Sequence, residues 1–158
     1  MSEFFNLSLQ RTARVFSVLS GVGGFVHGIG EFLQGKTATD GIYINSWADG
    51  PIALYMGGEP ALTILPTFLL AGILTMIVSL GLIIWAVFYD ENQHAGLGMS
   101  ILSILMLLFG GGVGPPVVGL LASIAGSRIG SSFAWWENRL DNGLGGFLCR
   151  IWGIVWWA

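Results

Sequence analysis

Residues 60–89 read PALTILPTFLLAGILTMIVSLGLIIWAVFY, thirty residues in succession without a charged side chain. A helix of this length measures about 45 Å at about 1.5 Å per residue, whereas the hydrocarbon core of a bilayer is about 30 Å thick. The run therefore predicts a membrane-spanning helix that tilts, protrudes or kinks. Pro60 suits the first turn of this helix, Pro66 is the natural kink point, and Asp90 begins the polar turn that ends it.

The composition of the whole chain agrees with a membrane environment. Of the 158 residues, 54% are apolar and only 9% are charged, whereas a soluble domain carries about 25% charged residues. So few charges cannot cover a water-facing surface, and we expect much of the exterior to face lipid. The seven Trp among 13% aromatic residues favour an aromatic belt at the bilayer interfaces. The six basic residues form no run, so we expect no nucleic-acid partner.

Two more apolar stretches are predicted to cross the membrane, at residues 12–34 and 97–126. The later stretch contains the run Gly110-Gly111-Gly112-Val113-Gly114-Pro115-Pro116. Gly112 and Gly114 weaken a helix, and Pro115 and Pro116 each remove a backbone donor. A break inside a bilayer requires protein or water to satisfy the freed carbonyls. Two interpretations remain open: a kinked spanning helix, which we adopt, and a re-entrant pair of half-helices.

The distribution of basic residues sets the predicted topology. Arg11 and Arg14 place the N-terminus in the cytoplasm, at a plasma or inner membrane, by the positive-inside rule. The connection 35–59 then lies outside, with a turn at Asp40-Gly41. Its aromatic residues have the amphipathic rings expected at headgroup level: Tyr43, Trp47 and Tyr55.

Residues 131–158 form the last part of the expected fold. Trp135-Trp136 beside Glu137 indicates an interfacial helix, and the apolar segment 144–158 follows it. That segment lies at the interface, crosses as a short fourth helix, or belongs to a span that continues beyond Ala158. The predicted fold is all-α: one domain, a small polytopic transmembrane bundle with three long helices and this C-terminal part.

The first predicted helix is divided into a polar and an apolar face. At 100° per residue its polar and small residues fall within an arc of about 100°, and the opposite arc is apolar. The polar arc contains Ser17, Ser20, Gly24, His27, Glu31 and Gln34. We expect this arc to face protein and the opposite arc to face lipid.

Small residues suggest close helix packing, within the chain or between copies. Gly24 and Gly28 stand four apart in the first helix. A four-residue ladder of mainly small side chains runs along the second helix: Glu59, Thr63, Thr67, Ala71, Thr75 and Ser79. Its hydroxyls can bond across helices or to their own carbonyls.

A candidate polar site joins the first two predicted helices. His27 and Glu31 lie one turn apart on one face, and an antiparallel hairpin brings the Glu31 end beside Glu59. The three side chains could form an acid–base relay or part of a cation site, for which no particular metal is indicated. They could equally be structural, with Glu31 accepting from His27 and Glu59 capping its own helix. The glycines at 23, 24, 28 and 30 leave a further alternative, a tetrapyrrole with His27 as axial ligand.

Three functional hypotheses follow. The one we adopt from the sequence is a packing or assembly subunit of a homo-oligomer or a larger membrane complex, without catalytic residues. The second is a small transporter-like or proton- or cation-conducting protein that uses His27, Glu31 and Glu59. The third is a redox or pigment subunit with a cofactor on His27. The sequence specifies neither a substrate nor a partner.

Overall fold

The computed structural model describes residues 2–47, 58–88 and 94–131, with side chains from Asn6 onward. The described residues contain helices α1 (Ser2–Leu33), α3 (Phe68–Phe88), α4 (Ala95–Leu108) and α5 (Gly114–Gly126), and strands β1 (Tyr43–Ser46) and β2 (Glu59–Leu62). The chain divides into two compact units, residues 3–130 and residues 1–2 with 131–158. The predicted interfacial helix and the apolar segment 144–158 lie outside the described residues.

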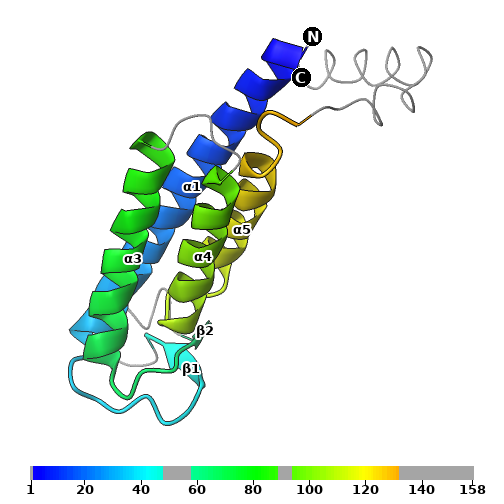
Figure 1. The fold of residues 1–158 in the computed structure, drawn as a ribbon. Helices are drawn as coiled ribbons and strands as arrows, with labels where there is room; N and C mark the ends of the chain where they lie inside the picture. The colour runs from blue at the N-terminus through cyan, green and yellow to red at the C-terminus, as the bar shows by residue number, and fades with distance from the viewer. Residues whose placement is uncertain (1, 48–57, 89–93, 132–158) are drawn as a thin grey trace, which may run out of the picture. The chain divides into compact units, whose positions relative to one another are not determined.

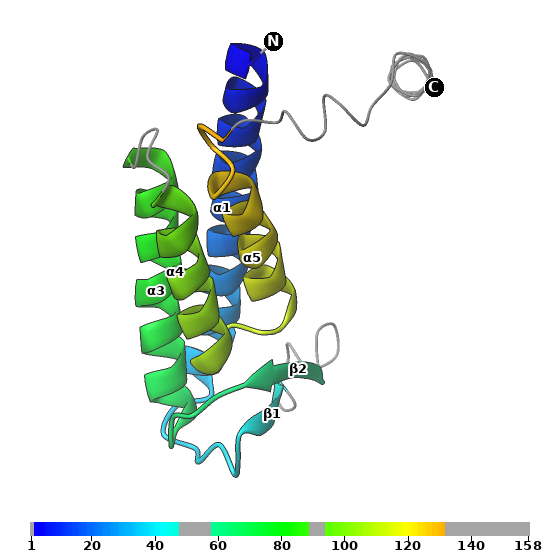
Figure 2. The same cartoon turned by 45° about the vertical axis from the view of Figure 1, so that its right-hand side comes forward.

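Within residues 3–130 the four helices run side by side and alternate in direction, and the two strands lie at one end of them (Figures 1 and 2). The all-helical prediction therefore holds for most of this unit, with the small antiparallel sheet as an addition. Two helical segments, Asn6–Leu33 and Phe68–Phe88, are long and apolar enough to cross a membrane by length and composition. Within residues 2–47, 58–88 and 94–131, a bundle of three long spans is not confirmed.

The stretch 97–126 forms two helices instead of the single kinked span that we predicted. Helix α4 ends at Leu108, and α5 starts at Gly114 with prolines in its first turn. The two helices pack against each other along their length, antiparallel (Figure 2). The positive φ angles of Gly110 (+100°) and Gly112 (+72°) allow the chain to reverse between them. Thus the glycine–proline run breaks the helix where predicted and separates two short helices, and their re-entry into a membrane stays a prediction.

Neighbouring segments satisfy the carbonyls that this break frees. The Leu108 carbonyl accepts from the Ile64 amide at 3.0 Å, and the Phe109 carbonyl accepts from the Thr75 hydroxyl at 3.0 Å. The Met106 carbonyl accepts from the Gly111 amide at 2.9 Å. Protein groups therefore provide the partners that such a break requires.

The second predicted helix begins later than expected. Residues 59–62 form β2, and α3 starts at Phe68, so Pro60 lies in a strand and Pro66 precedes the helix. Our predictions of Pro60 as a helix start and Pro66 as a kink are therefore wrong. Pro60 is compatible with an edge strand, where no ladder amide is needed, and a residue before a proline is biased away from helical angles. Carbonyls of the preceding loop cap the helix, since Thr37 O and Gly35 O accept from its first amides.

The helices approach closely at glycines. A Cβ atom on Gly28 would lie 3.0 Å from the Gly72 carbonyl oxygen, and one on Gly72 would lie 2.6 Å from the Gly28 carbonyl oxygen. A Cβ on Gly126 would lie 3.2 Å from Gly96 Cα. Helix α1 therefore packs on α3, and α4 on α5, through backbone contact.

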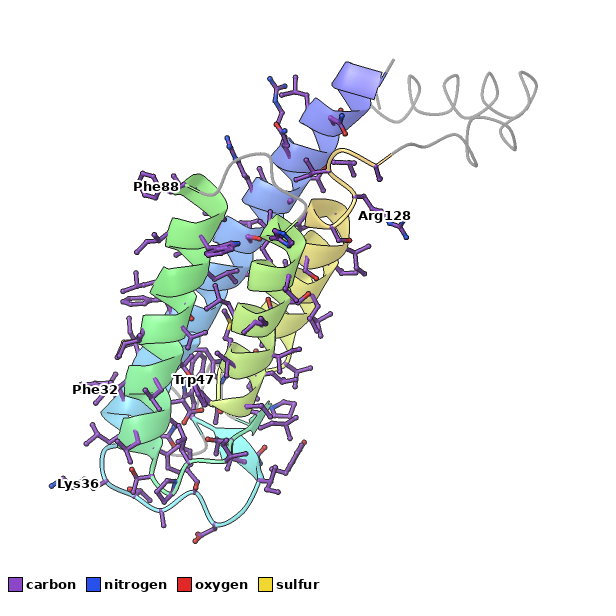
Figure 3. All side chains as sticks on the ribbon, viewed as in Figure 1. Phe32, Lys36, Trp47, Phe88 and Arg128 are labelled. Carbon is purple, nitrogen blue, oxygen red and sulfur yellow. The ribbon has the colours of Figure 1, made fainter. Side chains whose placement is uncertain are left out.

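Many polar side chains are buried inside the unit, beside an apolar core that includes Leu82 and Met106, and many large apolar side chains are exposed. The inward arc of α1 is fully or nearly fully buried at Ser17, Ser20, His27 and Glu31. Its opposite face exposes Val15, Leu19, Val22, Val26, Ile29 and Leu33. Phe32 and Phe88 also point away from the helices, as Figure 3 shows. A helix that buries its polar face and exposes its apolar face is the reverse of the usual arrangement in a water-soluble protein.

Candidate functional site

A buried hydrogen-bonded group occupies the sheet end of the unit. Ser46 donates from Oγ to Glu31 Oε1, and the same Oγ lies 3.1 Å from His27 Nε2. Glu31 Oε2 also accepts from Gln34 Nε2 at 3.1 Å. Glu31 and Ser46 are 0% exposed, and the His27 side chain is 3% exposed. Since His27 Nε2 and Glu31 Oε1 are 3.6 Å apart, Ser46 bridges them.

Glu59 contacts the other nitrogen of the same imidazole. Its Oε2 atom lies 3.2 Å from His27 Nδ1, and its side chain is 53% exposed. The sheet register pairs Ser46 with Glu59 directly, and such partners lie on the same face of a sheet. The strands therefore present both side chains to the helix that carries His27 and Glu31. The result is an ordered series of four side chains, from the accessible Glu59 through His27 and Ser46 to the buried Glu31.

Trp47 and Gly112 fix the position of the imidazole. The Trp47 ring centroid lies 4.8 Å from that of His27, and the planes are tilted by 32°. Trp47 is 5% exposed, lies between the helices (Figure 3), and packs against Gly30. A Cβ atom on Gly112 would lie 2.9 Å from His27 Cε1. Hence the turn between α4 and α5 contacts the imidazole directly.

No protein-family model, curated protein or solved structure matches this chain. Its function must be argued from its own residues.

The three residues singled out from the sequence lie together in space. Glu31 and Glu59 flank opposite nitrogens of His27, and whether this arrangement has a functional role stays a prediction. Sequence reasoning missed Ser46 and assigned Trp47 to the headgroup level, whereas the structure buries both. The structure alternates exposed and buried residues in Tyr43–Ser46, and Ser46 faces inward because its strand pairs with residues 59–62, which the sequence pattern did not predict.

The arrangement gives no support to a cation or a tetrapyrrole on His27. Both ring nitrogens already have partners, and the two carboxylates approach from opposite sides, so they do not converge with one nitrogen on a single point. Within the described residues no group of three His, Cys, Asp or Glu side chains is placed to hold a metal ion. The flat space expected around the α1 glycines is filled by Pro115, Met106, Met76 and Trp47.

The predicted packing residues make contacts inside the chain. Gly24 faces Met106 and Ser79, and Gly28 faces Gly72 and Met76. Of the four-residue ladder, only Ala71, Thr75 and Ser79 lie on helix α3, and all three are fully buried. Thr63 is buried and bridges to Phe109, while Thr67 Oγ1 accepts from the Leu70 amide near the start of α3.

Proposed function

We propose that this chain is an integral membrane protein that takes up and releases protons through Glu59, His27, Ser46 and Glu31. The observation that supports it is the unbroken series of four ionisable or hydroxyl side chains between a carboxylate that is 53% exposed and one that is 0% exposed. Groups within hydrogen-bond distance can exchange protons, and His and Glu are common participants in such transfers.

The reversed distribution of polarity supports the membrane location. Helix α3 exposes Ile77, Leu80, Ile84, Val87 and Phe88, while it buries Thr75 and Ser79. In water, exposing contiguous apolar faces and burying hydroxyls would both oppose folding. In lipid, the same arrangement places apolar groups in hydrocarbon and gathers the polar groups where protein can bond them. We expect the Glu59 end to lie at one membrane surface.

The geometry permits two proton distributions of equal total charge. In one, Glu31 is protonated and donates to Ser46, Ser46 donates to His27 Nε2, and His27 donates from Nδ1 to Glu59. In the other, Ser46 has passed its proton to Nε2 and received the proton of Glu31, so that an imidazolium lies between two carboxylates. The O–H bond of Glu31 breaks as a new O–H bond forms at Ser46, and the original O–H bond of Ser46 breaks as an N–H bond forms at His27 Nε2. Transfer from Nδ1 to Glu59 then brings the proton to an accessible oxygen.

The assembly role that we inferred from the sequence remains a separate hypothesis. It expected contacts from the polar face of the first helix and the hydroxyl ladder of the second, with small residues such as Gly24, Gly28 and Ala71 packing within the chain or between copies. These residues contact other helices of the same chain, so they provide no argument for an external partner. We therefore base the proposal on Glu59, His27, Ser46 and Glu31, which we call the relay.

Infrared difference spectroscopy of the full chain in lipid tests the proposal. A pH change should produce a carboxyl band from a buried glutamic acid, and Glu31→Gln should remove it. After a pH jump, Ser46→Ala should slow the appearance of this band by at least about tenfold, because the bridge between Glu31 and His27 is lost. Ser46→Thr retains a hydroxyl and should preserve most of the rate.

Asp40→Asn is the matched control. Asp40 is an exposed acid with φ of +40°, and Asn tolerates such an angle as well as Asp does. This variant should leave the buried carboxyl band unchanged. If Glu31→Gln retains the band, or if Ser46→Ala responds as fast as the parent, the four residues do not act as a proton relay.

A further inference from the structure

Buried hydroxyls continue from the site along the inside of α1 and α3. They are Thr75 and Ser79 on α3, and Ser20 and Ser17 on α1, each 0–1% exposed. Thr75 lies beside the turn that contacts His27, since a Cβ atom on Gly111 would lie 3.3 Å from Thr75 Cγ2. Ser79 Oγ lies 2.6 Å from the Cβ position of Gly24, one helical turn from His27.

Two of these hydroxyls have no hydrogen-bond partner among the described residues. They are Ser79 Oγ and Ser17 Oγ. A buried polar group without a partner costs about 1–3 kcal/mol, and in native proteins an ordered water commonly supplies the missing bond. Ser20 donates to the Pro115 carbonyl at 2.6 Å, which leaves its oxygen able to accept. Each of the three hydroxyls can therefore bond a water molecule.

The rise along the helix axis between these groups is comparable to the length that one bridging water can span. Along α1, Ser17 and Ser20 are three residues apart, and Gly24, with Ser79 beside it, follows four residues later. The steps are three or four residues, or about 4.5–6 Å at about 1.5 Å per residue. One water with two hydrogen bonds of about 2.8 Å spans about 5.6 Å.

The series ends near a small cavity at the opposite end of the helices. This cavity has a volume of about 10 Å³ and is lined by residues that include Gln10, Ala13, Arg14 and Met99. It has room for about one water molecule. Ala13, which lines the cavity, lies one helical turn from Ser17. A water molecule in the cavity would therefore be the next member of the series after Ser17.

We propose that Ser79, Ser20 and Ser17, joined by internal waters, extend the relay through the bundle to the Arg14 end and make the protein a proton conductor. This proposal rests on the proposed function, because it requires the Glu59–His27–Ser46–Glu31 series as its entrance. Along the path, each water and hydroxyl accepts a proton from one side and releases its own to the other. No oxidant, reductant or second substrate is needed.

Proton flux into proteoliposomes tests the path. The full chain is reconstituted with a pH-sensitive dye inside, and a pH gradient is applied with a potassium ionophore present to cancel the membrane potential. The parent protein should dissipate the gradient, and the double variant Ser17→Ala/Ser79→Ala should reduce the rate to that of protein-free liposomes. Ser79→Thr keeps a hydroxyl and should retain flux. Ser123→Ala is the control, because Ser123 is a buried serine outside the proposed series whose hydroxyl already donates to Leu120 O on α5.

X-ray hydroxyl-radical labelling adds a readout that does not depend on flux. Met106 is fully buried, and its Sδ atom lies beside the Cβ position of Gly24. Radicals formed from an internal water at Ser79 should oxidise Met106 in the folded protein, and the double variant should lose this labelling. Equal thermal stability of the variants and the parent verifies that they are folded.

The outcomes separate this proposal from the proposed function. If the parent shows the buried carboxyl band but no flux, or if the double variant conducts as well as the parent, the internal path is refuted and the relay stands. If Glu31→Gln leaves the band unchanged, the relay itself is refuted. Unlabelled Met106 in the parent would exclude water at Ser79 and overturn the path.

Discussion

Replacing either of two glycines of α3 by alanine should have opposite effects on stability. Gly72 and Gly81 lie in the same helix, but their surroundings differ. A Cβ atom on Gly72 would lie 2.6 Å from Gly28 O and 2.7 Å from Phe32 Cα, both backbone atoms of α1. A Cβ on Gly81 would lie 3.7 Å from Leu102 Cδ2, an ordinary contact, and has no closer neighbour.

These distances set the expected magnitudes. For Gly72→Ala, the gap to Gly28 O is about 0.8 Å shorter than an ordinary contact of 3.4 Å (3.4 − 2.6), so α1 and α3 must separate. A separation of this size forfeits a quarter to a half of the dispersion energy of each contact. Overpacking costs about 1–3 kcal/mol, and helix propensity returns about 0.5–1 kcal/mol. We expect a net loss of about 1–2 kcal/mol for Gly72→Ala and a gain of about 0.5–1 kcal/mol for Gly81→Ala.

The assay is reversible unfolding of both variants in mixed micelles with increasing SDS, followed by circular dichroism. Gly81→Ala is the control for the intrinsic effect of the substitution, because it changes the same residue type in the same helix. The predicted difference between the variants is about 2 kcal/mol. Equal shifts in both variants, or a Gly72→Ala protein as stable as the parent, would refute the backbone contact between α1 and α3.

Two further substitutions probe the break between α4 and α5. Thr75→Val removes the hydroxyl that donates to Phe109 O and should lower the free energy of unfolding by about 1–2 kcal/mol. In the same SDS titration, Thr75→Ser keeps a hydroxyl and should retain the stability of the parent. A Val variant as stable as the parent would contradict the role of this bond. Gly112→Ala places a Cβ 2.9 Å from His27 Cε1 at a φ of +72°, so we expect about 1–2 kcal/mol of backbone strain and altered ¹⁵N shifts of the His27 imidazole by NMR. Unchanged imidazole shifts would show that the turn does not position His27.

The sequence identified the features that depend on local chemistry. The period of α1 separated its buried polar face from its exposed apolar face, because the helical repeat alone determines which residues share a face. The run from Gly110 to Pro116 located the end of one helix and the start of the next, because glycine and proline act on the backbone at their own positions. A hairpin connection also indicated that Glu31 and Glu59 could meet, and the structure places both beside His27.

Contacts between segments far apart in the sequence decided the strand at Pro60, the inward position of Ser46 and the direction of α5. Pro60 fits the first turn of a helix and an edge strand equally well, and its pairing with Asn45 selected the strand. The same pairing turned Ser46 inward, between His27 and Glu31, a position that no local pattern specifies. After the break at Gly110–Gly112, α5 could have continued outward or folded back. It packs against α4, where a Cβ atom on Gly126 would lie 3.2 Å from Gly96 Cα. Hydrogen bonds from Ile64 and Thr75 satisfy the freed carbonyls, and these donors come from segments more than thirty residues away in the chain.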